Sequence, residues 1–184
     1  MSTKQSATIE DLYSAPDDMN AELVNGELVL MVPTGVNPKY AGDEIYASLR
    51  EYARRTRRGR AVADGAGFLV NLPNRKSFSP DAAFYQGTPD TMKFFDGAPI
   101  FAAEVRSAND YGQSAEREMA DKRADYFAAG TIVVWYVDLL SEDVVRVYRS
   151  DDPQRPTAYR RGEIADAEPA LPDWTMPVND LFFG

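Results

Sequence analysis

The sequence predicts a single domain of mixed α/β (α+β) class, in which a central mixed β-sheet is flanked by helices. Three observations support this class. The segments from residue 100 to residue 137 follow the order strand, helix, strand, which is typical of a parallel crossover. The other β-prone segments come in hairpin-like pairs, which add antiparallel strands. At 184 residues with 44% hydrophobic residues, the chain can bury one core but is short for two.

We therefore expect residues 16–184 to form one domain, preceded by an extension over residues 1–15. A short helical turn is predicted at 9–13, before Pro16. Two β-prone runs then flank Asn25-Gly26, the dipeptide that most strongly favours a tight hairpin turn. The first long helix is expected over residues 38–58, where apolar residues recur at helical spacing. Gly59 stands where such a helix would be capped.

The middle of the chain alternates short strands with polar loops. Strands are predicted at 61–63 and 67–70 around a turn at Gly65, followed by a polar loop over 71–77. Another strand begins at Asp81. A loop over 87–97 then leads to the almost wholly apolar strand 100–105, whose pattern is typical of a central strand covered on both faces.

The second half predicts the crossover and one more hairpin. A helix is expected over 113–129, closed by Gly130, and it leads into the buried strand 132–138. Residues 144–149 are expected to pair with that strand. From Pro153 onward the pattern loosens, and we expect only a short β segment near Tyr159 and a terminal turn at 178–183.

The composition excludes several kinds of chemistry. The chain has no Cys and no His, so disulfides, thiolate or histidine metal sites, cysteine nucleophiles and Ser-His-Asp triads are ruled out. Any bound metal would be a hard ion held by oxygens. No apolar run is long enough to span a membrane, and the first ten residues lack the pattern of a signal peptide. We expect a cytoplasmic protein without a membrane partner.

The net charge of −9 argues against a general affinity for nucleic acid, which depends on Lys and Arg. A basic block is nevertheless present at Arg54, Arg55, Arg57 and Arg58, with Lys39 upstream. These residues could form a local face for nucleic acid. The alternative, which we favour, is that the arginines decorate a helix C-terminus, where cations complement the helix dipole.

Two acids in apolar surroundings are the strongest functional signal. Asp81 opens the run Asp81–Phe84, and Glu104 follows Phe101-Ala102-Ala103 near the end of its strand. An acid in an apolar strand is costly unless it is used, and two convergent carboxylates typically hold a divalent metal. The alternatives are a strand-entry Asp that bonds its own backbone, and a buried Glu paired with Arg106 or Arg123.

Lys122 is the third candidate, because of its position on the predicted helix 113–129. At about 100° per residue, Ala115, Met119 and Tyr126 form the inward stripe, and Lys122 lies about 40° beyond Tyr126. Its ammonium could therefore reach the two carboxylates and act on a phosphate or orient water. The alternative is an exposed pair with Glu118. The helical phase leaves the two interpretations about even.

The order of these features resembles the Uma2 (DUF820) family of restriction-endonuclease-like proteins. The resemblance spans roughly Ile9 to the C-terminus, and it depends on the order and spacing of its parts. These are Ala21–Leu28, Pro80-Asp81, Glu104–Ser107, Lys122 with Tyr126 and Gly130, Trp135–Asp138 and the closing Leu171–Phe182.

The resemblance implies a PD-(D/E)xK nuclease fold and a set of site residues. Asp81 and Glu104 would bind Mg²⁺ or Mn²⁺, with the carbonyl of Val105 as a further ligand. The lysine of the plain motif is replaced by Arg106, which cannot act as a base, so the lysine role passes to Lys122. Glu22 matches the glutamate of the family's first hairpin.

One position departs from the family. Its members usually carry a His at the start of the first long helix, where this chain has Lys39 and Tyr40. Neither residue reproduces the titration of His near neutral pH.

The leading hypothesis is a Mg²⁺- or Mn²⁺-dependent endonuclease, a hydrolase of phosphodiester bonds with DNA favoured as substrate. Asp81, Glu104, Lys122 and Glu22 are its catalytic candidates. The alternative is a catalytically impaired relative that serves as a nucleic-acid or protein interaction module. Because nucleases of this fold often act on two strands as pairs, we also expect a homodimer.

Overall fold

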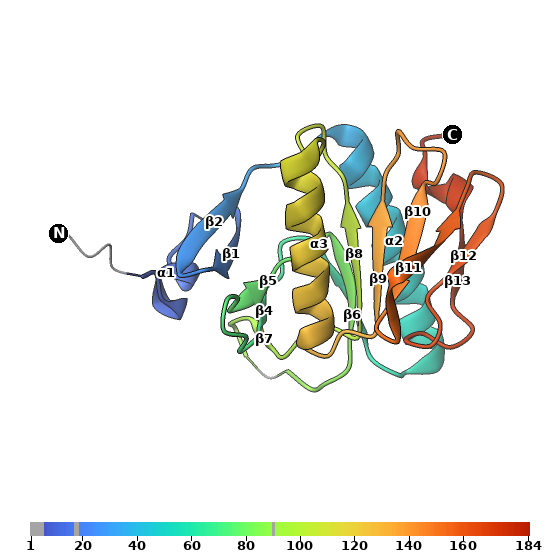
Figure 1. Ribbon diagram of the computed structural model, residues 1–184. Coiled ribbons are helices and arrows are strands. Elements are labelled where there is room, and N and C mark those ends of the chain that lie inside the picture. The colour runs from blue at the N-terminus through green and yellow to red at the C-terminus, as the bar shows by residue number, and fades with distance from the viewer. Residues whose placement is uncertain (1–5, 17–18, 90) are drawn as a thin grey trace.

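Six strands form one mixed sheet with a long helix on each face in the computed structural model, which describes residues 6–16, 19–89 and 91–184 (Figure 1). The order across the sheet is β11 (Asp152–Tyr159), β10 (Val145–Arg149), β9 (Val133–Val137), β8 (Phe101–Val105), β6 (Ala82–Tyr85) and β3 (Arg60–Ala63). Within this sheet, β8 and β9 pair in parallel and the other neighbouring strands pair antiparallel. This confirms the predicted mixed sheet, its parallel crossover and the pairing of the strand that follows Asp81 with strand β8.

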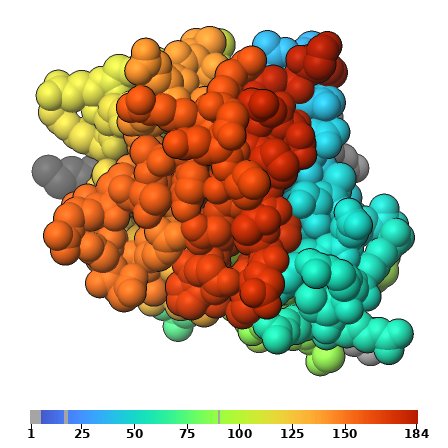
Figure 2. All heavy atoms as spheres, turned by 90° about the vertical axis from the view of Figure 1, so that its right-hand side faces the viewer, coloured from blue at the N-terminus to red at the C-terminus, as the bar shows by residue number. Residues whose placement is uncertain are grey.

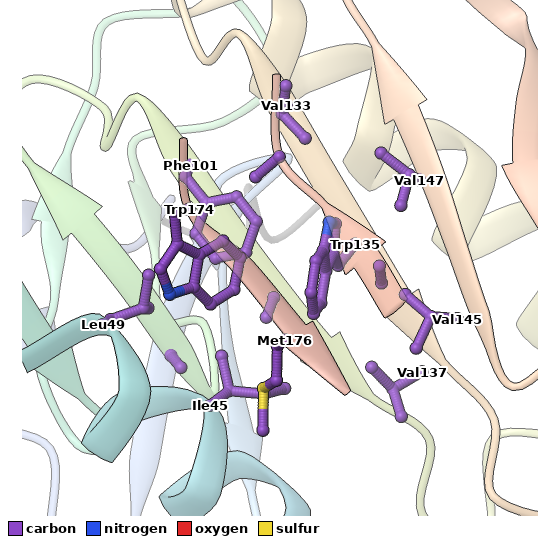
Figure 3. Packing of buried hydrophobic residues seen from close by; sticks show 14 of the residues in the cluster. Ile45, Leu49, Phe101, Val133, Trp135, Val137, Val145, Val147, Trp174 and Met176 are labelled. Carbon is purple, nitrogen blue, oxygen red and sulfur yellow. The ribbon is translucent and has the colours of Figure 1, made fainter. Parts of the chain in front are cut away.

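One face of the sheet carries an apolar core. Helix α2 (Val36–Thr56) packs Ile45 and Leu49 against Phe101 and Trp135 there (Figure 3). Side chains alternate along a strand, so Phe101, Ala103 and Val105 of β8 belong to this face. Glu104 therefore points to the opposite face of the sheet. The second helix, α3 (Gln113–Ala128), lies on that opposite face (Figure 1).

The C-terminal segment contributes to this core, which corrects the expectation of a loosely patterned tail. Strand β11 is eight residues long, and β12 (Ile164–Asp166) pairs with β13 (Thr175–Pro177), followed by the 3₁₀ helix η1 (Val178–Leu181). Trp174, 3% exposed, packs against Phe101 and Trp135. Figure 2 shows these residues, orange to red, covering the side of the molecule next to α2. Their apolar anchors are too widely spaced in sequence to form a periodic pattern.

The predicted N-terminal hairpin is confirmed, with β1 (Asn20–Val24) paired to β2 (Glu27–Met31). Asn25 and Gly26 have φ of 50° and 72°, the positive values that a tight two-residue turn requires. The predicted helical turn is α1 (Ile9–Tyr13), capped by Thr8. Its Leu12 is buried in a small cluster with Ala21 and Leu23 of β1.

A small sheet of β5 (Ser77–Phe78), β4 (Phe68–Leu69) and β7 (Phe95–Asp96) lies next to the main one. The predicted strands at 61–63 and 67–70 therefore belong to different sheets, and the expected loop over 87–97 contains β7. The predicted cap of the first helix was also wrong by two residues. Arg57 takes the left-handed conformation (φ 56°), whereas a side chain on Gly59 would meet the Phe84 ring at 2.5 Å.

Within the described residues, no helix is both long enough and apolar enough to cross a membrane.

Candidate active site

Asp81 and Glu104 lie side by side on the sheet face that α3 covers. The antiparallel register pairs Ala82 with Ala103, and the Asp81 amide donates to the Ala103 carbonyl at 3.1 Å, so the next pair in the ladder is Asp81 with Glu104. In the parallel ladder Glu104 pairs with Tyr136 of β9. The sheet thus brings the two predicted acids together from segments 23 residues apart in the chain.

Asp81 has a hydrogen bond but no cationic partner among the described residues. Its Oδ2 accepts the Val105 amide at 2.6 Å, so it bonds the neighbouring strand and not its own backbone, the alternative considered for a strand-entry Asp. Burial and the nearby Glu104 raise the pKa of Asp81 to about 7, against the opposing effects of the Val105 hydrogen bond and Lys122. A carboxyl with such a pKa next to a second acid is a functional-site signature.

Glu104 is held by α3. Its Oε1 accepts hydrogen bonds from Lys122 Nζ at 2.8 Å and from the Tyr126 hydroxyl at 2.6 Å. Burial and the charge of Glu22 raise the pKa of Glu104, and Lys122 opposes them. The alternative of a Glu–Arg pair is therefore wrong. Arg106 instead binds Asp138 and Glu116, and the Arg123 guanidinium lies 3.9 Å from the Tyr148 ring centre.

Lys122 reaches inward and bridges two acids. Its ammonium lies 2.8 Å from Glu104 Oε1 and 2.9 Å from Glu22 Oε1, with its side chain 15% exposed. The alternative of an exposed pair with Glu118 is wrong, since the Glu118 carboxylate accepts the Ser114 hydroxyl instead. Although burial alone would lower it, the pKa of Lys122 is raised by Glu104 and Glu22. In this arrangement Lys122 is a cation and a hydrogen-bond donor, not a base.

Glu22 joins the site from the hairpin. It is 4% exposed, and its Oε1 accepts the Ser79 amide at 2.8 Å in addition to Lys122. Burial acts to raise the pKa of Glu22, but Lys122 and Arg75 outweigh it, so the pKa is lowered. We call Glu22, Asp81, Glu104 and Lys122 the carboxylate cluster.

Arg75 is a site residue that sequence reasoning missed. It comes from the polar 71–77 segment, yet it is 5% exposed, pairs with Glu22 and bonds Asp125 at 2.8 Å. A single Arg in a polar loop gives no signal of burial. Asp64, in the turn after β3, was also missed. It follows Ala63, which pairs with Ala82, so it stands next to Asp81 across the sheet, and its charge also raises the pKa of Asp81.

The donor chemistry of the cluster fits a hard divalent cation. Among the described residues, no hydrogen bond reaches Asp81 Oδ1 or Glu104 Oε2, and both are carboxylate oxygens. The same part of the chain holds no group of three or more His, Cys, Asp or Glu arranged for a metal. Two carboxylates with waters completing the coordination suit Mg²⁺, which usually keeps several waters.

The arginines of the predicted basic block do not lie at the carboxylate cluster. A side chain on Gly42 would contact Asp81 at 3.5 Å, whereas one on Gly59 would contact Tyr85, at the other end of β6. Arg54, Arg55, Arg57 and Arg58 precede Gly59 and so lie at that far end, while Lys39 is near the site's end of α2. Lys39 pairs with Asp43, and Tyr40 stacks on Phe183 with ring centres 3.9 Å apart.

Comparison with known proteins gives this arrangement a family. Residues 7–179 match the Uma2 family, described as "Putative restriction endonuclease". The chain belongs to the Uma2 family. Among solved structures it is similar to a "putative nuclease belonging to DUF820" from Anabaena variabilis, with a TM-score of 0.73 and 18% identity over 95% of this chain and 97% of that one. This similarity confirms the fold. Among curated proteins the chain has no significant match.

Proposed function

We propose that this Uma2 protein is a metal-dependent endonuclease that hydrolyses phosphodiester bonds of nucleic acid, with DNA the favoured substrate. The observation that supports it most is the row of Asp81 and Glu104 with the Lys122 cation beside them. The family description and the nuclease fold favour the same reaction class. Two carboxylates and one fixed cation are the groups that phosphodiester hydrolysis with a divalent ion requires.

Each side chain has a distinct role in this proposal. Asp81 and Glu104 would hold Mg²⁺ or Mn²⁺, with the Val105 carbonyl as a further ligand. The bound ion would supply Lewis-acid stabilisation of phosphate charge and a more acidic water. Lys122 donates hydrogen bonds at the edge of that site and offsets the negative charge that develops on the phosphate. Glu22 and Arg75 act as positioning residues, because they fix the ammonium of Lys122 through Glu22 Oε1.

Cleavage of supercoiled plasmid and single-stranded DNA with Mg²⁺ or Mn²⁺ tests the proposal. We expect nicking by the wild type and none by Asp81→Ala or Glu104→Ala. Glu118→Gln is the matched control, since Glu118 lies on α3 one turn before Lys122 but outside the cluster. Titration calorimetry with Mn²⁺ gives an independent readout. Absence of both cleavage and carboxylate-dependent Mn²⁺ binding would overturn the proposal.

An interaction module without catalysis is the second candidate. It is favoured by the arginine at the usual lysine position, which is fully engaged with Asp138, Glu116 and the Asp110 carbonyl. The net charge of −9 and the absence of His agree with it. Binding of nucleic acid that is unchanged by Asp81→Ala, with no cleavage under any metal, would support this function over the first.

We infer a homodimer through the N-terminal hairpin. Strand β2 pairs only with β1 among the described residues, and exposed apolar side chains lie within it and just after it. Leu30 is 44% exposed and Val32 66%. An open apolar strand edge favours pairing with a second copy of itself. Light scattering after size exclusion should give twice the chain mass for the wild type and the monomer mass for Leu30→Lys; a monomeric wild type would contradict the inference.

A further inference from the structure

We propose that a cavity beside the carboxylate cluster binds an unstacked base of the nucleotide that flanks the cleaved phosphate. The cavity is about 800 Å³, within the usual range of small-ligand sites. Segments from α1, the turn after β3 and the residues before β7 line it. The inference depends on the proposed function for the nature of the ligand, and it adds a site that the carboxylate cluster does not include.

The walls of the cavity suit a planar aromatic ligand. Tyr13 and Phe94 both line it, and their rings meet edge to face with centres 5.2 Å apart. The Lys93 ammonium lies 5.0 Å from the Tyr13 ring centre, so a cation accompanies the aromatic wall. Aromatic side chains with a nearby cation are the usual platform for single-stranded bases, and stacking tolerates any base.

A glycine keeps the aromatic wall in place. A Cβ on Gly67 would meet the Phe94 ring at 2.3 Å, so Phe94 lies flush against bare backbone.

The inner end of the cavity offers a hydrogen-bond acceptor. Asn20 Nδ2 donates to Asp64 Oδ1 at 2.6 Å, which assigns the amide nitrogen to that side and leaves Asn20 Oδ1 as an acceptor. A Cβ on Gly65 would lie 3.8 Å from this oxygen, so the turn at Gly65 borders the acceptor. An N–H on a base edge can therefore bond Asn20 while the ring stacks.

The cavity is adjacent to the proposed chemistry. Ser79 lines it, and the Ser79 amide holds Glu22 of the carboxylate cluster at 2.8 Å. Ser79 precedes Asp81 by two residues, about 7 Å of extended chain. Asn20 likewise connects the cavity to Asp64, which stands beside Asp81 in the sheet row. A base bound here would belong to a nucleotide next to the phosphate at Asp81 and Glu104.

Fluorescence of a short single-stranded oligonucleotide that carries one 2-aminopurine tests the inference, in Mg²⁺ and on an Asp81→Asn background that prevents cleavage. Stacking should quench the probe on binding. We expect Tyr13→Leu to abolish the quenching and weaken binding about 10-fold, the usual loss for one stacked base. Ser14→Leu, which adds a bulky side chain without a stacking ring at an exposed position of the cavity lining, should do the same without removing the aromatic wall.

The matched control is Phe183→Leu, which removes a 57% exposed aromatic ring that stacks on Tyr40, outside the cavity lining. It should leave quenching and affinity unchanged. The inference would be overturned if the Asp81→Asn protein did not quench the probe. It would also be overturned if the Tyr13 and Ser14 variants quenched the probe as strongly as the Asp81→Asn protein does. Failure of the proposed function would appear separately, as a wild-type protein that does not cleave DNA. If the wild type cleaves DNA but the cavity variants change neither quenching nor affinity, the inference alone is wrong.

Discussion

Two ionic clusters, each centred on a largely buried cation, lie near each other in this molecule, and they differ in how their charges are matched. In the arginine cluster (Arg106, Glu116 and Asp138), the guanidinium bonds both acids and the Asp110 carbonyl. In the carboxylate cluster, Lys122 bonds Glu22 and Glu104 but Asp81 has no cation, and its pKa rises to about 7. The first arrangement is satisfied by the protein alone. The second leaves negative charge that a bound cation would stabilise.

The difference supports our proposal that the arginine cluster is structural and the carboxylate cluster is functional. A buried guanidinium with all its partners in place holds elements together, here the end of β8 against the start of α3 and the end of β9. A carboxyl kept at a raised pKa costs stability, and proteins accept that cost mainly at sites of function.

The largest expected effect comes from removing the central cation of each cluster. Lys122→Met should destabilise the fold by about 3–5 kcal/mol, because it removes the cation that the buried Glu22 and Glu104 share. Arg106→Met should also destabilise the fold but by less, because Asp138 is buried whereas Glu116 is more than half exposed. Only Lys122→Met should also lower the cleavage rate per folded molecule, by about 10²–10³-fold. Cleavage assays normalised to the folded fraction from circular dichroism separate the two effects. Equal loss of specific activity in both variants would remove the functional distinction.

Asp81→Asn should increase stability above pH 7. The folded-state pKa of about 7 exceeds the usual 3.8, so the folded protein binds the extra proton and the contribution of Asp81 to stability falls as pH rises from about 4 to 7. Asn cannot ionise, so at pH 8 the variant should be more stable than the wild type by about 2–4 kcal/mol. At pH 5 the difference should be less than half as large, and the two proteins should be nearly equal only below about pH 4. Thermal unfolding at both pH values measures this.

Added Mn²⁺ sharpens the same experiment. It should raise the melting temperature of the wild type at pH 8 and leave Asp81→Asn almost unchanged, because the ion binds the ionised carboxyl. Equal stability of wild type and variant at pH 8 would show that Asp81 is already neutralised within the protein, as the acids of the arginine cluster are.

The sequence predicted the mixed sheet with its parallel crossover, and the neighbouring acids of the candidate site, for clear physical reasons. Asp81 and Glu104 stand out because each lies in an otherwise apolar strand segment, and the alternation of strand residues then puts them on one face. The phase of α3 put Lys122 within reach of them. Long-range contacts carried no such signal. Arg75 bonds Glu22 and Asp125 across 53 and 50 residues, and no local pattern marks either pairing.

The same limit explains two of the structural corrections. Trp174 packs on Phe101 through contacts that only the folded sheet creates, so the tail lacked a periodic pattern. Gly59 resembled a helix cap in sequence, but the contact that requires glycine there is with Phe84, on a strand 25 residues later.

Tyr126→Phe should have a moderate effect. The change removes the hydroxyl that donates to Glu104 Oε1 at 2.6 Å and keeps the ring stacked on Phe78. We expect a loss of about 1.5–3 kcal/mol in stability, the usual value for a hydrogen bond to a charged group. Cleavage should fall less than in Lys122→Met, since the cation stays. Tyr111→Phe is the counterpart in the arginine cluster, where the hydroxyl donates to Asp138 at 2.8 Å, and it should leave cleavage unchanged.

The smallest expected effect belongs to the exposed arginines at the end of α2. Arg54 and Arg58 lie at the far end of β6 from Asp81, so a nucleic acid held at the carboxylate cluster should not contact them there. Arg54→Gln with Arg58→Gln should change cleavage by less than about 2-fold and leave the salt dependence of binding unchanged, whereas each lost phosphate contact would reduce the slope by about 0.9. Lys93→Gln, at the cavity, is the comparison variant, and it should reduce the slope of the salt dependence. A reduced slope in the arginine variant would mean that the bound strand extends along α2, and the basic block would then be part of the nucleic-acid interface.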